Sequence, residues 1–511
     1  MQLHKQQPNK GYNTLALQAA ERARARSLVD ILTEANADIR QGVAPQLLEK
    51  ERNLQQRLDA NDKRRAQLLN GKYTPNQLAA LEKDTNALLT QYQQIQTQIR
   101  QSSPRYAALT QPQPLTLAQM QKLLDPNTVL LEYFLGEERS YLWMVTSNGI
   151  SSYELPKQEQ IETAARQYYQ LLTDKRLDLV ETDLAQVSDQ LSQMLLFPVA
   201  NQLGEKRLVI VSDGALQYIP FAALKDPIAK TNNNQPQPLV VKHEVVNLPS
   251  ALTLAVTRSE SKRKLPPKTL AVFADPVFDL SDERVKKRSE AKPPQVESSV
   301  IASLTRSTSD VGIANTNQSV ARLPGTEIEA EKILSLVPAN SRQQAFGFAA
   351  NFANATNPNL SQYRMIHFAT HGLLNSENPE LSGVVLSLVD SQGNPQNGFL
   401  GLRQVYNLKL PAQLVVLSAC QTGLGKEIQG EGLVGLTRGF MYAGTPRVVA
   451  SLWSVNDAAT AELMKRFYQN MLQKKLTPAA ALRSAQVELW QQQQIGAPYY
   501  WAAFVLQGDW K

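Results

Sequence analysis

The chain has 511 residues and a formal net charge of +7, with 42% hydrophobic and 19% charged residues. This composition supports a sizeable core and excludes a chain that is disordered throughout. A single cysteine excludes an intrachain disulfide and a multi-cysteine metal site, and it is typical of the reducing cytoplasm, where we expect the protein. The apolar runs are too short for a membrane span and the first residues are too polar for a signal peptide, so we expect no membrane partner.

Basic charge is concentrated in the first fifth of the sequence. Residues 1–105 carry 16 Lys and Arg against 10 Asp and Glu, and the remainder is nearly balanced. These basic residues lie on helical sequence without interleaved aromatic residues or a recognisable binding motif. We interpret them as solvated helix faces and do not expect a nucleic-acid partner; a patch that binds nucleic acid is the alternative.

Residues 1–110 are predicted to form an all-α arm. Over 12–40 the sequence predicts an amphipathic helix, and Tyr12–Ala25 is similar to the second helix of a tetratricopeptide repeat. One such repeat cannot bury its own apolar face, so residues 1–44 are predicted to end a repeat array or to cap their own neighbours. Over 45–110, leucines at spacings of three, four and seven predict an antiparallel helical hairpin. The stripe is typical of structural helices; docking of a regulatory protein partner is the alternative.

From residue 120 onward the pattern changes to strands alternating with helices, which is typical of an α/β sheet. Residues 120–262 are predicted to form a first subdomain and residues 263–511 a second, with a mobile Ser-, Lys- and Pro-rich insertion over 281–320. Continuous apolar strands flanked by helices predict a three-layer αβα sandwich. The expected strands are 128–134, 141–145, 207–211, 270–274, 365–368, 384–388, 414–417 and 448–452, and the expected helices lie near 157–203, 326–337, 432–443, 457–473 and 478–494.

Two reactive side chains follow predicted strands of the second subdomain. His371 follows a strand that ends near Ala369, and Cys420 follows one that ends near Leu417. Ligands of parallel sheets bind beyond the carboxyl ends of the strands, so both residues are expected in that crevice. A cysteine hydrolase needs a thiolate nucleophile and an imidazole within hydrogen-bond reach. The alternative is a buried cysteine and an unrelated core histidine.

The segments that carry these residues resemble a known family. His-Phe-Ala-Thr-His-Gly over 367–372 and Leu-Ser-Ala-Cys-Gln-Thr-Gly over 417–423 look like the signature of the CHAT domain, a caspase-like peptidase family related to separase. The similarity extends to the runs 208–222, 430–440, 450–457 and 500–508, and so covers residues 120–511. Members commonly carry tetratricopeptide repeats before this domain, which agrees with the predicted arm.

The resemblance implies a function and roles for particular residues. His371 would be the general base and Cys420 the nucleophile, with the backbone N–H groups of Gly372 and Cys420 forming the oxyanion hole. Residues 120–262 look like the inactive caspase-like half found beside the active half in some relatives, and they contain no cysteine. The resemblance implies a cysteine endopeptidase that cleaves protein or peptide substrates without a cofactor or a metal. The alternative is a non-catalytic scaffold for protein–protein interaction.

Two acidic residues are predicted to bind the substrate. In a caspase-like sheet, the pocket for the residue before the cleaved bond is lined from the places that hold Asp275 and Asp457 here. Carboxylates there would favour Arg or Lys in the substrate. Asp457 has the alternative of capping the helix that follows, and Asp275 of terminating its strand.

His367 lies four residues before His371, a spacing that binds metals when it occurs on a helix. On a strand, four residues span more than about 12 Å, so we expect no metal and interpret His367 as a core or supporting residue.

Overall fold

The computed structural model describes the chain except for residues 35–42, 70–74, 103–114, 230–236, 261–264, 286–319, 374–381, 419, 422–430, 454–455 and 493. The chain divides into two compact units. The smaller unit is Ala25–Gln113, and the larger one combines Met1–Arg24 with Pro114–Lys511. Most of the insertion that we predict over 281–320 lies outside the described residues, as do residues 70–74 between the two helices of the predicted hairpin.

The smaller unit contains two long helices that pack side by side. Tyr92 of one helix donates a hydrogen bond to Gln55 of the other, and Asn61 donates to Asp84. Higher numbers on one helix therefore face lower numbers on the other, so the helices run antiparallel. Their bounds are α3 (Pro45–Leu69) and α4 (Pro75–Ser102), and the buried side chains include Val43, Leu54, Leu81, Leu88 and Ile99. The predicted helix over 12–40 is α2 (Tyr12–Glu34), and the rest of that range is not described.

In the larger unit, eleven strands among the described residues form one continuous sheet in the order β3-β2-β1-β4-β5-β15-β14-β12-β8-β6-β7. Neighbours are parallel except in the β3-β2-β1 meander and between β15 and β14. The bounds are β1 (Thr128–Phe134), β2 (Ser140–Val145), β3 (Ile150–Leu155), β4 (Arg207–Val211), β5 (Val245–Asn247), β6 (Lys268–Ala274), β7 (Arg342–Phe346), β8 (Tyr363–Ala369), β12 (Leu414–Leu417), β14 (Arg447–Ser451) and β15 (Phe504–Gly508).

The C-terminal strand joins the two predicted halves into this one sheet. β15 pairs in parallel with β5 of the first half and antiparallel with β14 of the second. All five of its residues are buried. The halves are therefore not separate sheets, because each supplies one neighbour of the same strand.

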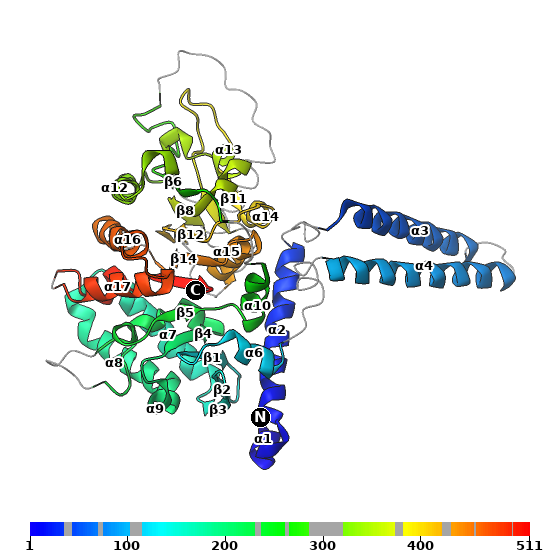
Figure 1. The fold of residues 1–511 in the computed structure, drawn as a ribbon, viewed down its shortest axis with the longest axis horizontal. Helices are drawn as coiled ribbons and strands as arrows, with labels where there is room; N and C mark the ends of the chain where they lie inside the picture. The colour runs from blue at the N-terminus through cyan, green and yellow to red at the C-terminus, as the bar shows by residue number, and fades with distance from the viewer. Residues whose placement is uncertain are drawn as a thin grey trace. The chain divides into compact units, whose positions relative to one another are not determined.

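Helices cover both faces of the sheet, as the continuous apolar strands predict. The side chains of β12 are buried along its whole length, which requires cover on both sides. Figure 1 shows α12, α16 and α17 on one side of the sheet and α10 and α15 on the other. The mixed α/β fold that we predicted is confirmed. The bounds of these helices are α10 (Ala251–Glu260), α12 (Pro324–Leu334), α15 (Glu431–Tyr442), α16 (Asp457–Leu472) and α17 (Pro478–Trp490), and the range predicted as helical over 157–203 contains α7 (Gln158–Thr173), α8 (Leu177–Leu195) and α9 (Ala200–Leu203).

A second, four-stranded sheet lies beyond the carboxyl ends of β8 and β12, in the order β11-β10-β9-β13. Its strands are β9 (His371–Leu373), β10 (Gly383–Val385), β11 (Phe399–Gly401) and β13 (Cys420–Gln421). The strand predicted over 384–388 is present as β10, but it ends at Val385 and belongs to the small sheet, not to the main one. The backbone N–H groups of Leu386, Ser387 and Leu388 donate to three different segments, at Gly398, Ala350 and Val277, so the ladder stops at Val385.

Candidate active site

The site is built from two neighbouring strands whose chains continue into the small sheet. β8 and β12 are parallel, with Met365 opposite Leu414 and Phe368 opposite Leu417. Each chain then leaves the main sheet within a few residues and forms the parallel pair β9–β13. Since the same register continues across both pairs, two residues that follow their strands at similar distances are brought opposite one another.

His371 and Cys420 are those two residues. Their Cα atoms are register partners in β9 and β13. Neighbouring strands lie about 4.8 Å apart, so the backbones of these two residues run side by side. The expectation that both residues lie beyond the carboxyl ends of adjacent parallel strands agrees with this arrangement. The small sheet that holds them is a feature that the sequence did not reveal.

The His371 side chain is buried and has one firm hydrogen bond. Its Nε2 lies 2.7 Å from the backbone carbonyl oxygen of Ala321. A carbonyl can only accept, so Nε2 carries the proton and the neutral ring has its lone pair on Nδ1. That Nδ1 is buried and has no hydrogen-bond partner among the described residues. Burial lowers the pKa of His371, and the Ala321 carbonyl opposes the shift. A neutral imidazole with an unengaged nitrogen is suited to accept a proton.

Gly372 occupies the centre of the small sheet. It is the register partner of Val384 in β10 and of Gln421 in β13. Its backbone therefore runs beside the residue that follows Cys420. The oxyanion-hole role that we expect for Gly372 and Cys420 stays a prediction.

Asp275 lies directly after β6 and its side chain is 1% exposed. Arg322 donates from Nε and Nη2 to this carboxylate at 3.1 and 2.8 Å, and Arg284 donates from Nη1 at 2.6 Å. The backbone N–H of Asp275 donates to the hydroxyl of Thr326. The carboxylate that we expect to receive a substrate cation therefore already binds two cations of its own chain.

Asp457 is exposed at the first residue of α16. It touches the start of α12, where a Cβ on Gly325 would collide with its carboxylate. The capping residue of α16 is Asn456, whose side chain accepts from the N–H groups of Ala458 and Ala459. Asn456, and not Asp457, therefore caps the helix. The Asp457 carboxylate lies in the first turn of α16, where its negative charge complements the helix dipole. Its predicted contact with substrate stays a prediction.

A buried polar chain lies behind the site and includes His367. The His367 Nε2 lies 3.0 Å from a carboxylate oxygen of Glu329 in α12, and its Nδ1 lies 3.1 Å from the hydroxyl of Tyr468 in α16. The other Glu329 oxygen accepts from Ser418, two residues before Cys420, at 3.1 Å. His367 therefore supports the core, as we expected. Among the described residues, no group of three or more His, Cys, Asp or Glu side chains could hold a metal ion.

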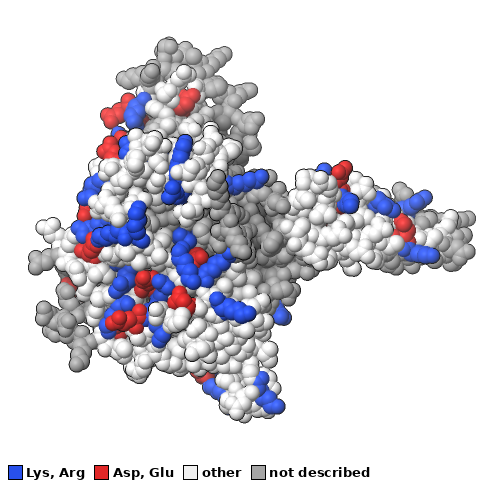
Figure 2. Space-filling model, viewed as in Figure 1, with Lys and Arg blue, Asp and Glu red and all other residues white. Residues whose placement is uncertain are grey.

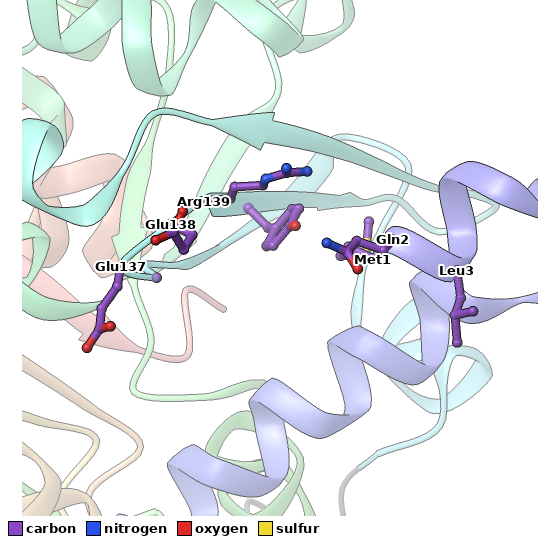
Figure 3. A pocket seen from close by; sticks show the side chains of 8 residues that line it. Met1, Gln2, Leu3, Glu137, Glu138 and Arg139 are labelled. Atoms are coloured by element: carbon purple, nitrogen blue, oxygen red, sulfur yellow. The ribbon is translucent and has the colours of Figure 1, made fainter.

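Other surface features lie elsewhere in the larger unit. An open hollow of about 590 Å³ lies between α1 (Gln2–Gln6) and the turn that joins β1 to β2 (Figure 3). Its lining includes Glu137, Glu138 and Arg139, whose charges do not converge on one point. On the face in Figure 2, basic and acidic side chains lie in mixed clusters. None of the helices that the structure describes is long and apolar enough to cross a membrane.

Comparison with known proteins finds one human relative, one mouse relative and several similar solved structures. The chain is 25% identical to human tetratricopeptide repeat protein 28 over 333 residues, covering 60% of this chain and 12% of that protein. It is 28% identical to the mouse protein over 185 residues, covering 29% of this chain and 7% of that protein. The chain therefore spans only a small part of the length of these relatives.

The structural matches are distant. Separase in the Saccharomyces cerevisiae separase–securin complex aligns with a TM-score of 0.44 and 10% identity, covering 80% of this chain and 31% of that chain. The Arg-specific cysteine proteinase gingipain R aligns with a TM-score of 0.35 and 11% identity, covering 64% of this chain and 66% of that one. Likeness at this level carries no functional inference. A family model described as "CHAT domain" matches residues 185–509, which is more than half of the sequence, and the chain belongs to the CHAT domain family.

Proposed function

We propose that this chain is a cysteine endopeptidase in which Cys420 is the nucleophile and His371 is the general base. The observation that carries the proposal is the register pairing of the two residues, combined with the hydrogen bond that leaves Nδ1 of His371 as the basic nitrogen. Membership of the CHAT domain family supports it. We further propose that it acts in the cytoplasm and that a protein partner regulates it through the helical arm.

In the proposed reaction, Nδ1 of His371 removes the thiol proton of Cys420, and the thiolate attacks the carbonyl carbon of the substrate peptide bond. Backbone N–H groups of Gly372 and Cys420 stabilise the oxyanion. The imidazolium then protonates the leaving amine as the C–N bond breaks, which leaves a thioester. Water, deprotonated by His371, hydrolyses the thioester and restores the thiol. The Ala321 carbonyl stabilises the imidazolium, because it accepts a hydrogen bond from Nε2 throughout.

We propose substrates with Arg or Lys before the cleaved bond. The exposed carboxylate of Asp457 supports this preference, because it is open to a cationic side chain. Asp275 can contribute only if a substrate cation displaces Arg322, which holds the carboxylate with two hydrogen bonds. The non-catalytic scaffold remains the competing function.

Labelling with a cysteine-directed electrophilic peptide tests the proposal. Fast labelling of Cys420 in the wild type that is lost in His371→Gln would support the peptidase. The matched control is His243→Gln, because His243 is also buried, donates from Nδ1 to the Lys206 carbonyl oxygen at 2.7 Å, and has its pKa lowered by burial. It lies in the first half of the sheet. Equal, slow labelling of all three proteins would instead favour the scaffold.

A further inference from the structure

The link between Asp275 and His371 passes through a single peptide unit. Arg322 binds the Asp275 carboxylate, and Ala321, its neighbour in sequence, provides the carbonyl that accepts from His371. Two consecutive residues therefore make the two contacts: Ala321 contacts His371, the candidate base, and Arg322 contacts the Asp275 carboxylate. Neither contact is local in sequence, since Asp275 lies 47 residues before Arg322 and His371 lies 50 residues after Ala321.

We propose that Asp275 is a positioning residue for His371: by fixing Arg322 it fixes the Ala321 carbonyl that selects the tautomer and orientation of the imidazole. The consequence for catalysis rests on the proposed peptidase function. The positioning itself does not, because it concerns a hydrogen bond that exists without substrate.

Asp275 is itself firmly held, which allows it to act as an anchor. It directly follows β6, and its N–H is bonded to Thr326 at the start of α12. Its φ of 45° lies in the left-handed region, which a non-glycine residue adopts only where the surroundings require it. A planar guanidinium with two hydrogen bonds to such a carboxylate has little freedom to shift.

Two arginines that are far apart in the sequence, Arg284 and Arg322, donate to this one carboxylate. Arg284 precedes residues 286–319 and Arg322 follows them. Arg284 also donates to the backbone carbonyl of Asp275 at 3.0 Å. The carboxylate therefore joins the described residues before 286 and after 319 to the end of β6.

Without Asp275, the other acidic groups near Arg322 would hold it weakly. Asp282, whose charge also acts on Arg322, accepts hydrogen bonds from Arg284 on both carboxylate oxygens. Glu283 lies 3.2 Å from Arg322 but its side chain is 84% exposed, and Glu327 lies 3.9 Å away and is also exposed. Ion pairs between exposed side chains contribute little, because water screens them and ordering long side chains costs entropy. Asp275 is thus the group that decides where Arg322, and with it the Ala321 carbonyl, lies.

Three variants separate this role from a general effect of charge. Asp275→Asn keeps the side-chain shape and tolerates the left-handed backbone, since Asn also adopts it readily. Arg322→Met removes the second partner at a half-exposed position, so it stays informative should Asp275→Asn fail to fold. The matched control is Asp279→Asn. Asp279 lies four residues after Asp275, and its carboxylate accepts hydrogen bonds from the backbone N–H and the hydroxyl of Ser281.

The direct readout is the Nε2–H proton of His371 in protein labelled with ¹⁵N-histidine, assigned by its loss in His371→Gln. We expect a slowly exchanging downfield signal in the wild type and in Asp279→Asn. In Asp275→Asn and Arg322→Met, we expect exchange at least about tenfold faster, because an unanchored carbonyl no longer protects the proton. Unchanged exchange in a folded Asp275→Asn or Arg322→Met protein would overturn the proposal.

Kinetics on a cleaved peptide then distinguish positioning from substrate binding. Positioning predicts that kcat falls at least about tenfold while KM changes little, since a misplaced base slows chemistry and leaves binding intact. A raised KM for basic peptides with unchanged kcat and an unchanged Nε2–H signal would overturn positioning and assign Asp275 to the substrate pocket. If the wild type cleaves nothing, the peptidase proposal fails, and the NMR result alone decides on positioning.

Discussion

The imidazole of His371 and the carbonyl of Ala321 are 50 residues apart in the sequence and 2.7 Å apart in the fold. This one hydrogen bond decides which ring nitrogen carries the proton. It leaves the lone pair on Nδ1, which is buried and without a partner among the described residues and which takes the Cys420 proton in the proposed reaction. The proposed chemistry and its pH dependence follow from that choice.

Replacing Cys420 with Ser or Ala is expected to abolish peptide cleavage and electrophile labelling. Loss of a nucleophile lowers the rate by at least about 1,000-fold, because the remaining groups cannot form the covalent intermediate. The fold should remain, which thermal unfolding would check. Cleavage by a folded Cys420→Ala protein at a comparable rate would rule out the assignment.

The rate should stay high to mildly acidic pH. His371 must be neutral to act as a base, and burial lowers its pKa below the ordinary value of 6.5. The neutral form therefore persists as the pH falls through 6.5. We expect the acidic limb of kcat/KM against pH to have its midpoint below 6.5, measured on a peptide whose own groups do not titrate there. A midpoint above 6.5 would contradict the buried, Nε2-protonated ring.

Glu329→Gln should destabilise the protein strongly. Glu329 is almost fully buried: one carboxylate oxygen accepts from Ser418, and the other lies 3.0 Å from Nε2 of His367. Leaving a buried polar group without its partner costs about 1–3 kcal/mol of the free energy of unfolding. Urea unfolding would measure it, with Glu331→Gln on the exposed side of the same helix as the control. Equal unfolding midpoints for the two variants would show that the network contributes nothing.

Ser418→Ala should have a smaller effect on stability and a measurable effect on the site. It removes one hydrogen bond to Glu329, worth about 1 kcal/mol. Because Ser418 lies two residues before Cys420, we expect slower labelling of Cys420 by the electrophilic peptide. Labelling at the wild-type rate in this variant would show that the hydrogen bond between Ser418 and Glu329 does not affect the reactivity of Cys420.

Glu132→Gln should flatten the dependence of stability on pH. Burial, followed by the neighbouring Glu21, raises the pKa of Glu132 well above its ordinary value of 4.5, against the effect of Arg24. The folded protein therefore holds a proton that the unfolded chain has lost, so this stabilisation is complete below pH 4.5 and declines as the pH rises toward the folded pKa.

Gln carries no charge to bury, so the loss of unfolding free energy between pH 5 and pH 8 should be smaller than in the wild type. Urea unfolding at the two pH values tests this, with the exposed Glu137→Gln as the control. Identical pH slopes in the wild type and Glu132→Gln would contradict a buried, protonated Glu132.

A peptide panel varied only before the cleaved bond tests the proposed basic preference. We expect cleavage after Arg and Lys, and a several-fold loss of that preference in Asp457→Asn, because a neutral amide no longer attracts the cation. Asn456→Asp retains a cap for α16 and adds a carboxylate beside Asp457, so it should keep the preference. Preferred cleavage after neutral or acidic residues in the wild type would exclude the proposed preference for Arg and Lys.

The sequence by itself determined the strands with strong local patterns and the positions of the reactive residues relative to them. Leu414–Leu417 is an apolar run bounded by polar residues, and it forms β12 as predicted. Whether a segment forms a strand, and where the strand ends, depends largely on residues close together in the sequence. The positions of His371 and Cys420 just after their strands could therefore be inferred without a structure. The short β5 and the polar edge strand β7 (Arg342–Phe346) carry no such local signal, and the sequence did not predict them.

Only the tertiary structure decided the contacts between distant segments. The insertion of β15 between β5 and β14, the pairing of β9 with β13, and the two arginines on Asp275 each join residues that are far apart in sequence. The sequence indicates that Asp275 follows a strand, but its environment is set by Arg284 and Arg322. Because a carboxylate open to solvent and one bound by two guanidinium groups have the same local sequence, the difference between a substrate pocket and an internal anchor arises only on folding.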